Sequence, residues 1–142
     1  MKSITAVFSV AALLFTVTAW SAEGDSRELV ELPDMMQSHM LANMRDHLAA
    51  FNEILSKMAV GDLDAAAEIA EYRLGMTSLQ SHGASHMAPF MPQAMRSTGT
   101  QMHKAASRFA LKAQEGEPLA AYSALAEVTQ ACVACHSAYR IR

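Results

Sequence analysis

The chain has 142 residues, a formal net charge of −3 at pH 7 and a hydrophobic content of 51%. This length suffices for one compact domain with a single core, but not for two. The mild acidity argues against nucleic acid as a partner, because domains that bind nucleic acid are usually basic. Only two cysteines are present, which excludes a framework of structural disulfides.

The first 22 residues have the pattern of a secretory signal peptide. Lys2 is followed by an uncharged, mostly apolar run over residues 4–19, and small residues then precede the charged stretch that begins at Glu23. The apolar run is shorter than the roughly 20 residues that a membrane-spanning helix needs. We therefore expect residues 1–22 to be a cleaved export signal and residues 23–142 to form one domain.

The rest of the chain is rich in strong helix formers, and no alternating run typical of a β-strand occurs. Gly and Pro residues interrupt the helical pattern after residue 60, between residues 81 and 92, and at residues 116–118. These interruptions predict four amphipathic helices, over about residues 33–58, 62–80, 92–115 and 118–139. Four such helices with short connections predict an all-α fold, an antiparallel up-down-up-down four-helix bundle.

Apolar residues in the first and fourth predicted helices recur at separations of three and four, which places them on one face of each helix. In the first helix this stripe comprises Leu41, Met44, Leu48, Phe51, Leu55 and Met58, flanked by Met40, His47 and Ile54. In the fourth helix it comprises Leu119, Tyr122, Leu125, Val128, Cys132 and His136. We expect both stripes to face the core.

The most specific motif of the chain is Cys132-Val133-Ala134-Cys135-His136, near the C-terminus. The C-x-x-C-H spacing is that of covalent haem attachment, in which each thiol adds to one haem vinyl group and the histidine supplies an axial nitrogen to the iron. On a helix, residues three and four apart are neighbours, so the three side chains share one face. The motif therefore predicts one haem c, bound through Cys132 and Cys135, with His136 as an axial ligand.

Two other chemistries fit a pair of cysteines at this spacing. A thiol–disulfide redox couple is typical of a βαβ setting, which the helical pattern does not provide. A zinc site needs two further ligands at a suitable spacing, and the chain has no second cysteine pair. Haem attachment is the interpretation that these tests favour.

A helical chain with an export signal and C-x-x-C-H in its last helix resembles the cytochrome c′ family. The family's motif is commonly C-K-A-C-H-x-x-Y/F-R, which Ala134, Tyr139 and Arg140 match, whereas Val133 stands where lysine is usual. The similarity is confined to residues 132–140, and over the first three helices it is one of pattern only. The resemblance implies that Arg140, one turn beyond His136, meets a haem propionate, although a solvated terminal arginine is an equal alternative.

The resemblance also implies that the first helix covers the distal face of the haem. Laying the heptad on the family pattern places Leu41 over the iron, which would leave it open to NO or CO. Met40 and Met44 lie next to this position, and either thioether would instead close the iron for electron transfer. Two histidines of the same helix are further alternatives, His39 and His47.

The leading hypothesis is a periplasmic c-type cytochrome that transfers electrons, binds a diatomic gas, or does both. The alternative is a haem-free exported bundle that binds copper through thioethers and imidazoles. Its candidate ligands are His82, His86, Met87, Met91, Met95, Met102 and His103. No acid–base pair is recognisable, so we do not expect an enzyme. A redox partner protein is expected but not identified, and the resemblance is compatible with a homodimer.

Overall fold

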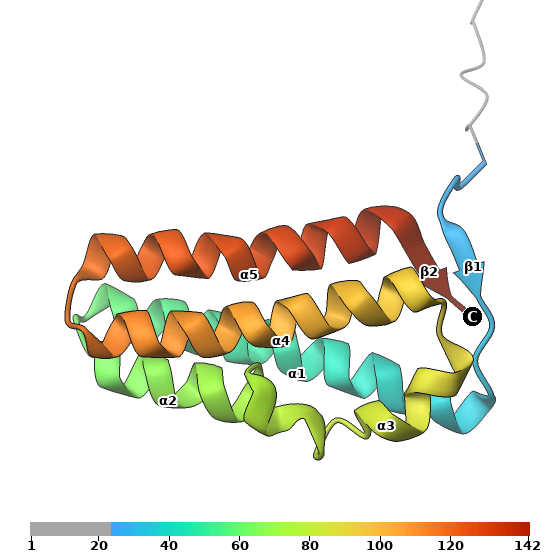
Figure 1. The fold of residues 1–142 in the computed structure, drawn as a ribbon, viewed down its shortest axis with the longest axis horizontal. Coiled ribbons are helices and arrows are strands. Elements are labelled where there is room, and N and C mark those ends of the chain that lie inside the picture. The colour runs from blue at the N-terminus through green and yellow to red at the C-terminus, as the bar shows by residue number, and fades with distance from the viewer. Residues whose placement is uncertain (1–23) are drawn as a thin grey trace, which may run out of the picture.

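The computed structural model describes residues 24–142, and the predicted signal peptide therefore lies outside the described residues (Figure 1). Helices dominate this part of the chain, which confirms the all-α prediction. The α-helices are α1 (Asp34–Ala59), α2 (Leu63–Arg73), α3 (Ala84–Met87), α4 (Gln93–Gln114) and α5 (Pro118–Ala138). Two 3₁₀ helices, η1 (Met76–Leu79) and η2 (Ala88–Phe90), flank α3, and the two short strands are β1 (Glu28–Val30) and β2 (Tyr139–Ile141).

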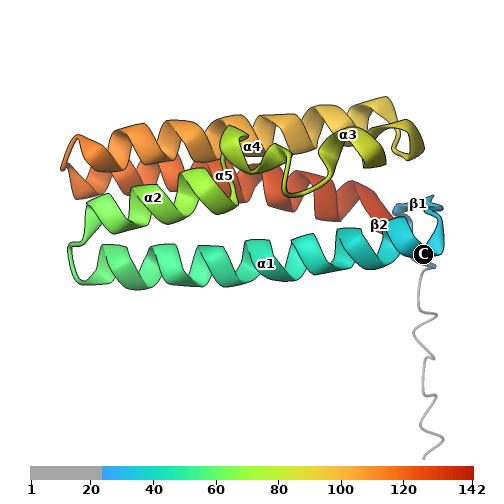
Figure 2. The same cartoon turned by 90° about the horizontal axis from the view of Figure 1, so that it is seen from below.

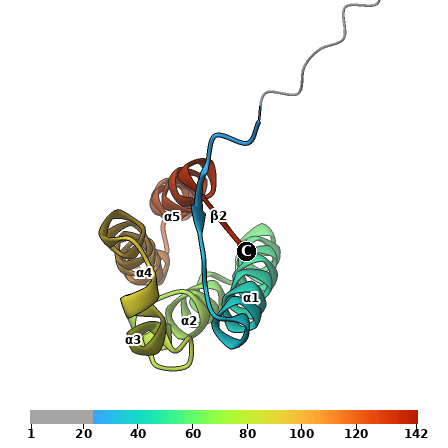
Figure 3. The same ribbon diagram turned by 90° about the vertical axis from the view of Figure 1, so that its right-hand side faces the viewer.

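The four longer helices lie lengthwise beside one another (Figures 1 and 2). The view along the helices shows α5, α4, α2 and α1 following one another around the molecule (Figure 3). Helix α4 packs closely against α5, and α2 packs against both α1 and α4, whereas packing between α1 and α5 is much looser. None of the helices in the described residues combines the length and the hydropathy that a membrane span requires.

Turn residues explain most of the helix boundaries. Gly61 and Gly116 adopt φ angles of 77° and 79°, a left-handed conformation that glycine accepts without strain, and each follows the end of a long helix. The Asp62 side chain then caps α2 by accepting a hydrogen bond from the backbone N–H of Ala65 (3.2 Å). Pro118 occupies the first position of α5, where a missing N–H has no cost.

The second helix ends earlier than its predicted limit at residue 80. Helix α2 stops at Arg73, and the chain continues through η1. The carbonyl of Leu74 is bonded by the His103 imidazole (Nδ1···O 2.7 Å), and the Ser78 hydroxyl donates to the carbonyl of Gly75 (2.7 Å). In a continued helix, the carbonyls of Leu74 and Gly75 would accept hydrogen bonds from backbone N–H groups four residues later; here side chains supply donors to both carbonyls. The first of these contacts comes from α4 and the second is local, so the segment after Arg73 is stabilised both by tertiary packing and by its own residues.

The predicted apolar stripe of α1 is wrong by one residue at alternate positions. Met40 and Ile54 are 6% and 0% exposed, whereas Leu41 and Leu48 are 41% and 71% exposed. A seven-residue repeat does not divide evenly into turns of 3.6 residues, so sequence spacing leaves two adjacent positions as candidates for the same face. The neighbouring helices select the one that they cover.

The stripe of α5 is correct only in its middle. Leu125 and Val128 are buried, but Leu119, near the start of the helix, is 86% exposed, and Tyr122 is also exposed. Small residues, Ala121 and Ala124, take the buried positions in this turn because α4 approaches closely. The main core then extends across all four long helices, with Ile54 and Phe109 as its largest fully buried apolar side chains.

A parallel strand pair joins the two ends of the described chain, and the sequence did not predict it. Residue 28 pairs with residue 139 and residue 30 with residue 141 (Figure 1). Val30 and Leu32 are buried in a second apolar cluster, against which Cys135 and Tyr139 pack. The segment that begins the domain is thereby held against the end of the helix that carries the C-x-x-C-H motif.

Candidate functional site

The C-x-x-C-H motif occupies the last two turns of α5, where that helix and α1 are loosely packed. Cys132 and Cys135 are half-buried free thiols, and His136 is exposed. All three line one cavity of about 320 Å³. Its other walls come mainly from α1 and α4, through Met44, His47, Leu48, Phe51, Thr98, Gly99 and Met102. The structure therefore brings the three motif residues together on the wall of one cavity.

A second cavity of about 470 Å³ adjoins the first. The two share Met44, His47, Gly99, Met102 and Cys135 on their walls. The larger one extends toward η1, α3 and η2 and is lined by six methionines: Met40, Met44, Met87, Met91, Met95 and Met102. Flexible thioethers of this kind adapt to an irregular or occupied space more readily than branched side chains do.

Gly99 provides a test of whether a flat group fits these cavities. A glycine inside a helix destabilises it by about 1 kcal/mol relative to alanine, so it calls for an explanation. Gly99 lies in the interior of α4 on the wall of both cavities, and an added Cβ would meet no atom within 4 Å. Protein packing does not require the glycine, whereas close approach of a bound planar group would. The residues present thus fit a macrocycle held by Cys132 and Cys135.

The environment of the two thiols differs from that of a redox-active pair. Burial raises the pKa of Cys132, and burial together with the neighbouring Cys132 raises the pKa of Cys135. Reactive C-x-x-C pairs instead have a lowered pKa, because the thiolate is the attacking species. The surroundings are also helical, with no βαβ unit among the described residues. A dithiol couple remains the weaker interpretation.

On the first helix, the structure separates the candidates for the residue opposite the motif. Leu41 lines neither cavity, although Leu48 of the same predicted stripe lines the smaller one, and the place of Leu41 over the iron stays a prediction. Met44 lines both cavities, and Met40 lines the larger one and packs in the same apolar cluster as Cys135. His39 lines neither cavity, whereas His47 lines both.

Arg140 lies in β2, just beyond the motif. Its Nε is buried without a hydrogen-bond partner, and the nearest acidic group is the carboxylate of Asp25, at 3.5 Å. Asp25 is engaged by Arg27, whose guanidinium donates to it and holds its pKa at about 2. The third guanidinium nitrogen of Arg27, Nη1, lies 3.5 Å from the backbone carbonyl oxygen of His136. The orphaned Nε leaves Arg140 with a donor for an anionic group, and the propionate contact stays a prediction.

Three imidazoles gather beside the cavities: His82 and His103, which the sequence placed among the candidate copper ligands, and His47, which it gave as a candidate axial ligand. The ring centroids of His47 and His82 are 4.7 Å apart. The ring centroid of His103 lies 5.9 Å from that of His47 and 5.5 Å from that of His82. Nε2 of His47 and Nδ1 of His82 are 3.4 Å apart. His82 is only 7% exposed, although a loop histidine is usually solvated, and His86 does not join the cluster. Because the three residues come from separate segments, no sequence spacing indicates this cluster.

Burial keeps these imidazoles neutral. Desolvation, with the proximity of His82 and His103, lowers the pKa of His47 to about 4. Desolvation is also the main cause that lowers the pKa of His82 and of His103. Within residues 24–142, no group of three or more His, Cys, Asp or Glu side chains is arranged to hold a metal ion.

Comparison of the chain with protein-family models, with curated proteins and with solved structures finds no match. The interpretation of the site accordingly depends on its residues and geometry.

Proposed function

We propose that this protein is an exported c-type cytochrome of the cytochrome c′ kind, with one haem c attached through Cys132 and Cys135 and with His136 as an axial ligand. The observation that carries the proposal is the shared position of these three residues on an apolar cavity at the loosely packed side of the helices. The open space over Gly99 supports it. The proposed location is the periplasm, consistent with the predicted export signal.

The proposal includes the antiparallel four-helix-bundle topology. The colour gradient of the ribbon supports it, since α1 and α2 run in opposite directions, as do α4 and α5 (Figure 2). In such bundles, cofactor sites are built in the interior from side chains on facing helices. A site between α1 and α5 has this character.

Haem supplies an iron that changes oxidation state or binds a diatomic ligand, and its axial ligands and surroundings decide between these uses. Within the protein, the two thiols fix the orientation of the macrocycle and His136 supplies a nitrogen from the same helix face. Phe51, Met102 and Val128 line the cavity with apolar surface and limit the access of water. Low polarity around a haem is one of the factors that set its reduction potential.

Electron transfer is the use that the first helix favours. Leu41 does not line the cavities, whereas the α1 side chains that do line them include the thioethers of Met40 and Met44. A thioether at the sixth position closes the iron to exogenous ligands. We therefore propose six-coordinate iron, in place of the open iron that the Leu41 register predicted.

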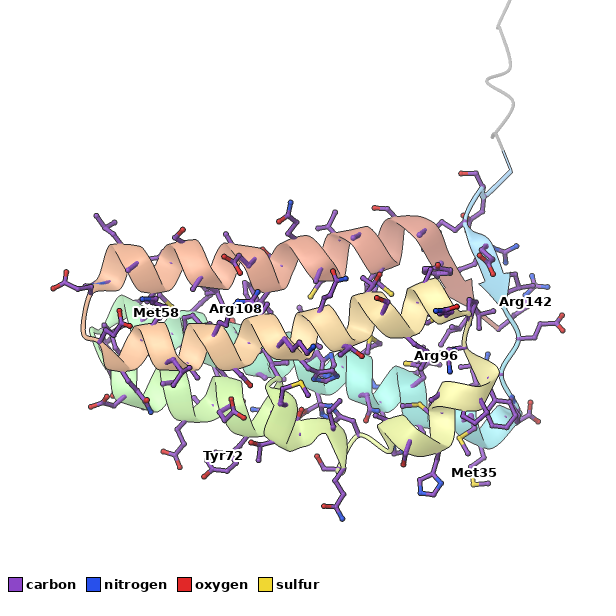
Figure 4. All side chains as sticks on the ribbon, in the orientation of Figure 1. Met35, Met58, Tyr72, Arg96, Arg108 and Arg142 are labelled. Atoms are coloured by element: carbon purple, nitrogen blue, oxygen red, sulfur yellow. The ribbon has the colours of Figure 1, made fainter. Side chains whose placement is uncertain are left out.

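A spectroscopic experiment tests this assignment. The reduced haem protein should show a low-spin absorption spectrum that CO leaves unchanged. Replacing the ligating methionine by leucine should open the iron to CO, and Met40→Leu and Met44→Leu identify which one it is. The exposed Met35, which projects outward near the start of α1, provides the matched control Met35→Leu (Figure 4). Binding of CO to the unaltered protein would contradict the six-coordinate proposal.

Covalent attachment is tested independently of ligation. After export in a host that matures c-type cytochromes, haem should stay with the denatured chain through acid–acetone extraction. Cys132→Ala combined with Cys135→Ala should abolish this retention, whereas His136→Ala should preserve at least some of it. Ser137→Ala alters an exposed residue of the same helix and should have no effect. Complete extraction of haem from the unaltered protein would refute the proposal.

A further inference from the structure

The imidazole pair beside the larger cavity has the spacing of two metal ligands. His47 comes from α1 and His82 from the segment between η1 and α3, and both line this cavity. Their facing nitrogens, Nε2 and Nδ1, are 3.4 Å apart. In a tetrahedral site with metal–nitrogen bonds of about 2.0–2.1 Å, two ligand nitrogens are separated by about 3.3–3.4 Å. The distance between the two nitrogens is thus that of two ligands of one metal ion, and it is also that of a hydrogen bond between the rings.

Contacts from α1 hold His82 in this position. His39 and Asn43, two turns and one turn before His47 on the same helix face, both bond the backbone carbonyl of His82 at 2.9 Å. The Ser78 hydroxyl lies 3.3 Å from Nδ1 of His82. A chain segment without regular structure is thereby fixed against α1. Ligands that are positioned before binding lose less conformational entropy when a metal binds.

The third donor comes most directly from α4. Met102 is 7% exposed and lines both cavities together with His47. Met102 directly precedes His103 in α4, and the ring of His103 lies within 6 Å of the rings of His47 and His82. Helix α4 therefore runs beside this imidazole pair at Met102 and His103. His103 itself is held through Nδ1 by the carbonyl of Leu74. No third His, Cys, Asp or Glu of the described chain completes a site, and Met44 and Met102 are the thioethers that line both cavities together with His47.

We propose that His47, His82 and Met102 form a binding site for Cu(I). Thioether ligands select soft Cu(I), and imidazole also binds copper well, whereas zinc sites take Cys, His and carboxylate ligands. The proposed copper ligands do not include Cys132, Cys135 or His136, although Cys135 lines the larger cavity and both His47 and Met102 also line the smaller one.

The test is an anaerobic competition titration with Cu(I), supplied as its complex with a chromophoric chelator. The mature chain is used in two forms, haem-loaded protein, in which both thiols are consumed, and the variant Cys132→Ala with Cys135→Ala, which has none. Each form should withdraw one equivalent of Cu(I) from the chelator. Copper X-ray absorption should show both nitrogen and sulfur neighbours.

Variants then assign the ligands. His47→Gln and His82→Gln should each weaken binding by at least about 10–100-fold, the loss seen even when outer-shell support of a metal ligand is removed. Met102→Leu, which conserves volume, should remove the sulfur signal and weaken binding. The matched controls are His86→Gln and Met35→Leu, which alter an exposed imidazole and an exposed thioether. Thermal melts confirm that each variant is folded.

Three results would overturn the proposal. One is the failure of both thiol-free forms to withdraw Cu(I), which would leave His47 and His82 as a hydrogen-bonded pair only. Another is unchanged affinity in His47→Gln and His82→Gln. The third is a sulfur signal that persists in Met102→Leu. None of these results bears on haem attachment, so the two proposals fail or stand separately.

Discussion

Replacing Ile54 by alanine tests the packing register of α1. Ile54 is fully buried in the core that joins the four long helices, whereas the sequence pattern placed it at the edge of the apolar stripe. Removing buried aliphatic groups of this size destabilises a protein by about 2–5 kcal/mol, because the lost contacts leave a cavity that closes only partly. The total free energy of unfolding is about 5–15 kcal/mol, so the variant should remain folded with a much reduced margin.

The assay is thermal and urea unfolding of the haem-loaded protein, followed by circular dichroism. A loss of about 3 kcal/mol should lower the thermal midpoint by about 12 °C, at about 4 °C per kcal/mol for a domain of this size. The matched control is Leu111→Ala on α4, which removes a similar side chain that is 65% exposed and should change stability by less than about 0.5 kcal/mol. Equal losses in the two variants would refute the burial pattern on which the cavity assignment depends.

Three further outcomes are expected. Protein made haem-free by Cys132→Ala with Cys135→Ala should melt well below the haem-loaded form, because the cavity of about 320 Å³ beside the motif loses its filling; equal calorimetric midpoints would contradict this. Asp62→Ala should cost about 1 kcal/mol in urea unfolding through loss of the α2 cap, and Asp62→Asn should restore most of it. In metal-free protein, the pKa of His47 is about 4 when folded and 6.5 in its ordinary state, so the unfolded chain binds more protons between these values. The free energy of unfolding should therefore keep the contribution of neutral His47 in full above about pH 6.5 and fall by on the order of 3 kcal/mol as the pH approaches 4. The variant His47→Gln should reduce this pH dependence, measured by urea unfolding.

Local signals were sufficient for the helices whose ends depend on nearby residues. Helix α1 begins at Asp34, directly after Pro33, and α5 begins at Pro118, as the sequence predicted. The end of α2 was missed, because the carbonyl of Leu74 is bonded by a residue 29 positions further along the chain. The strand pair was missed for the same reason, since its two short segments lie at opposite ends of the described chain.

The candidate site shows the same division. The proposed attachment residues follow from a five-residue motif, because Cys132, Cys135 and His136 share a helix face wherever that helix packs. The opposite wall could not be predicted in this way, since Leu41 and Met40 are adjacent and only packing decides which one turns inward.

The sequence by itself determined the all-α class, the approximate extent of the long helices and the motif that predicts a covalent haem, because each depends on residues close together in the chain. Only the tertiary structure decided which face of α1 lines the cavities, that Met40 and Met44 replace Leu41 there, and that His47, His82 and His103 meet. The physical reason is that burial and contact between distant segments depend on how whole helices pack, and a helical repeat leaves adjacent positions nearly equivalent until a neighbouring helix covers one of them.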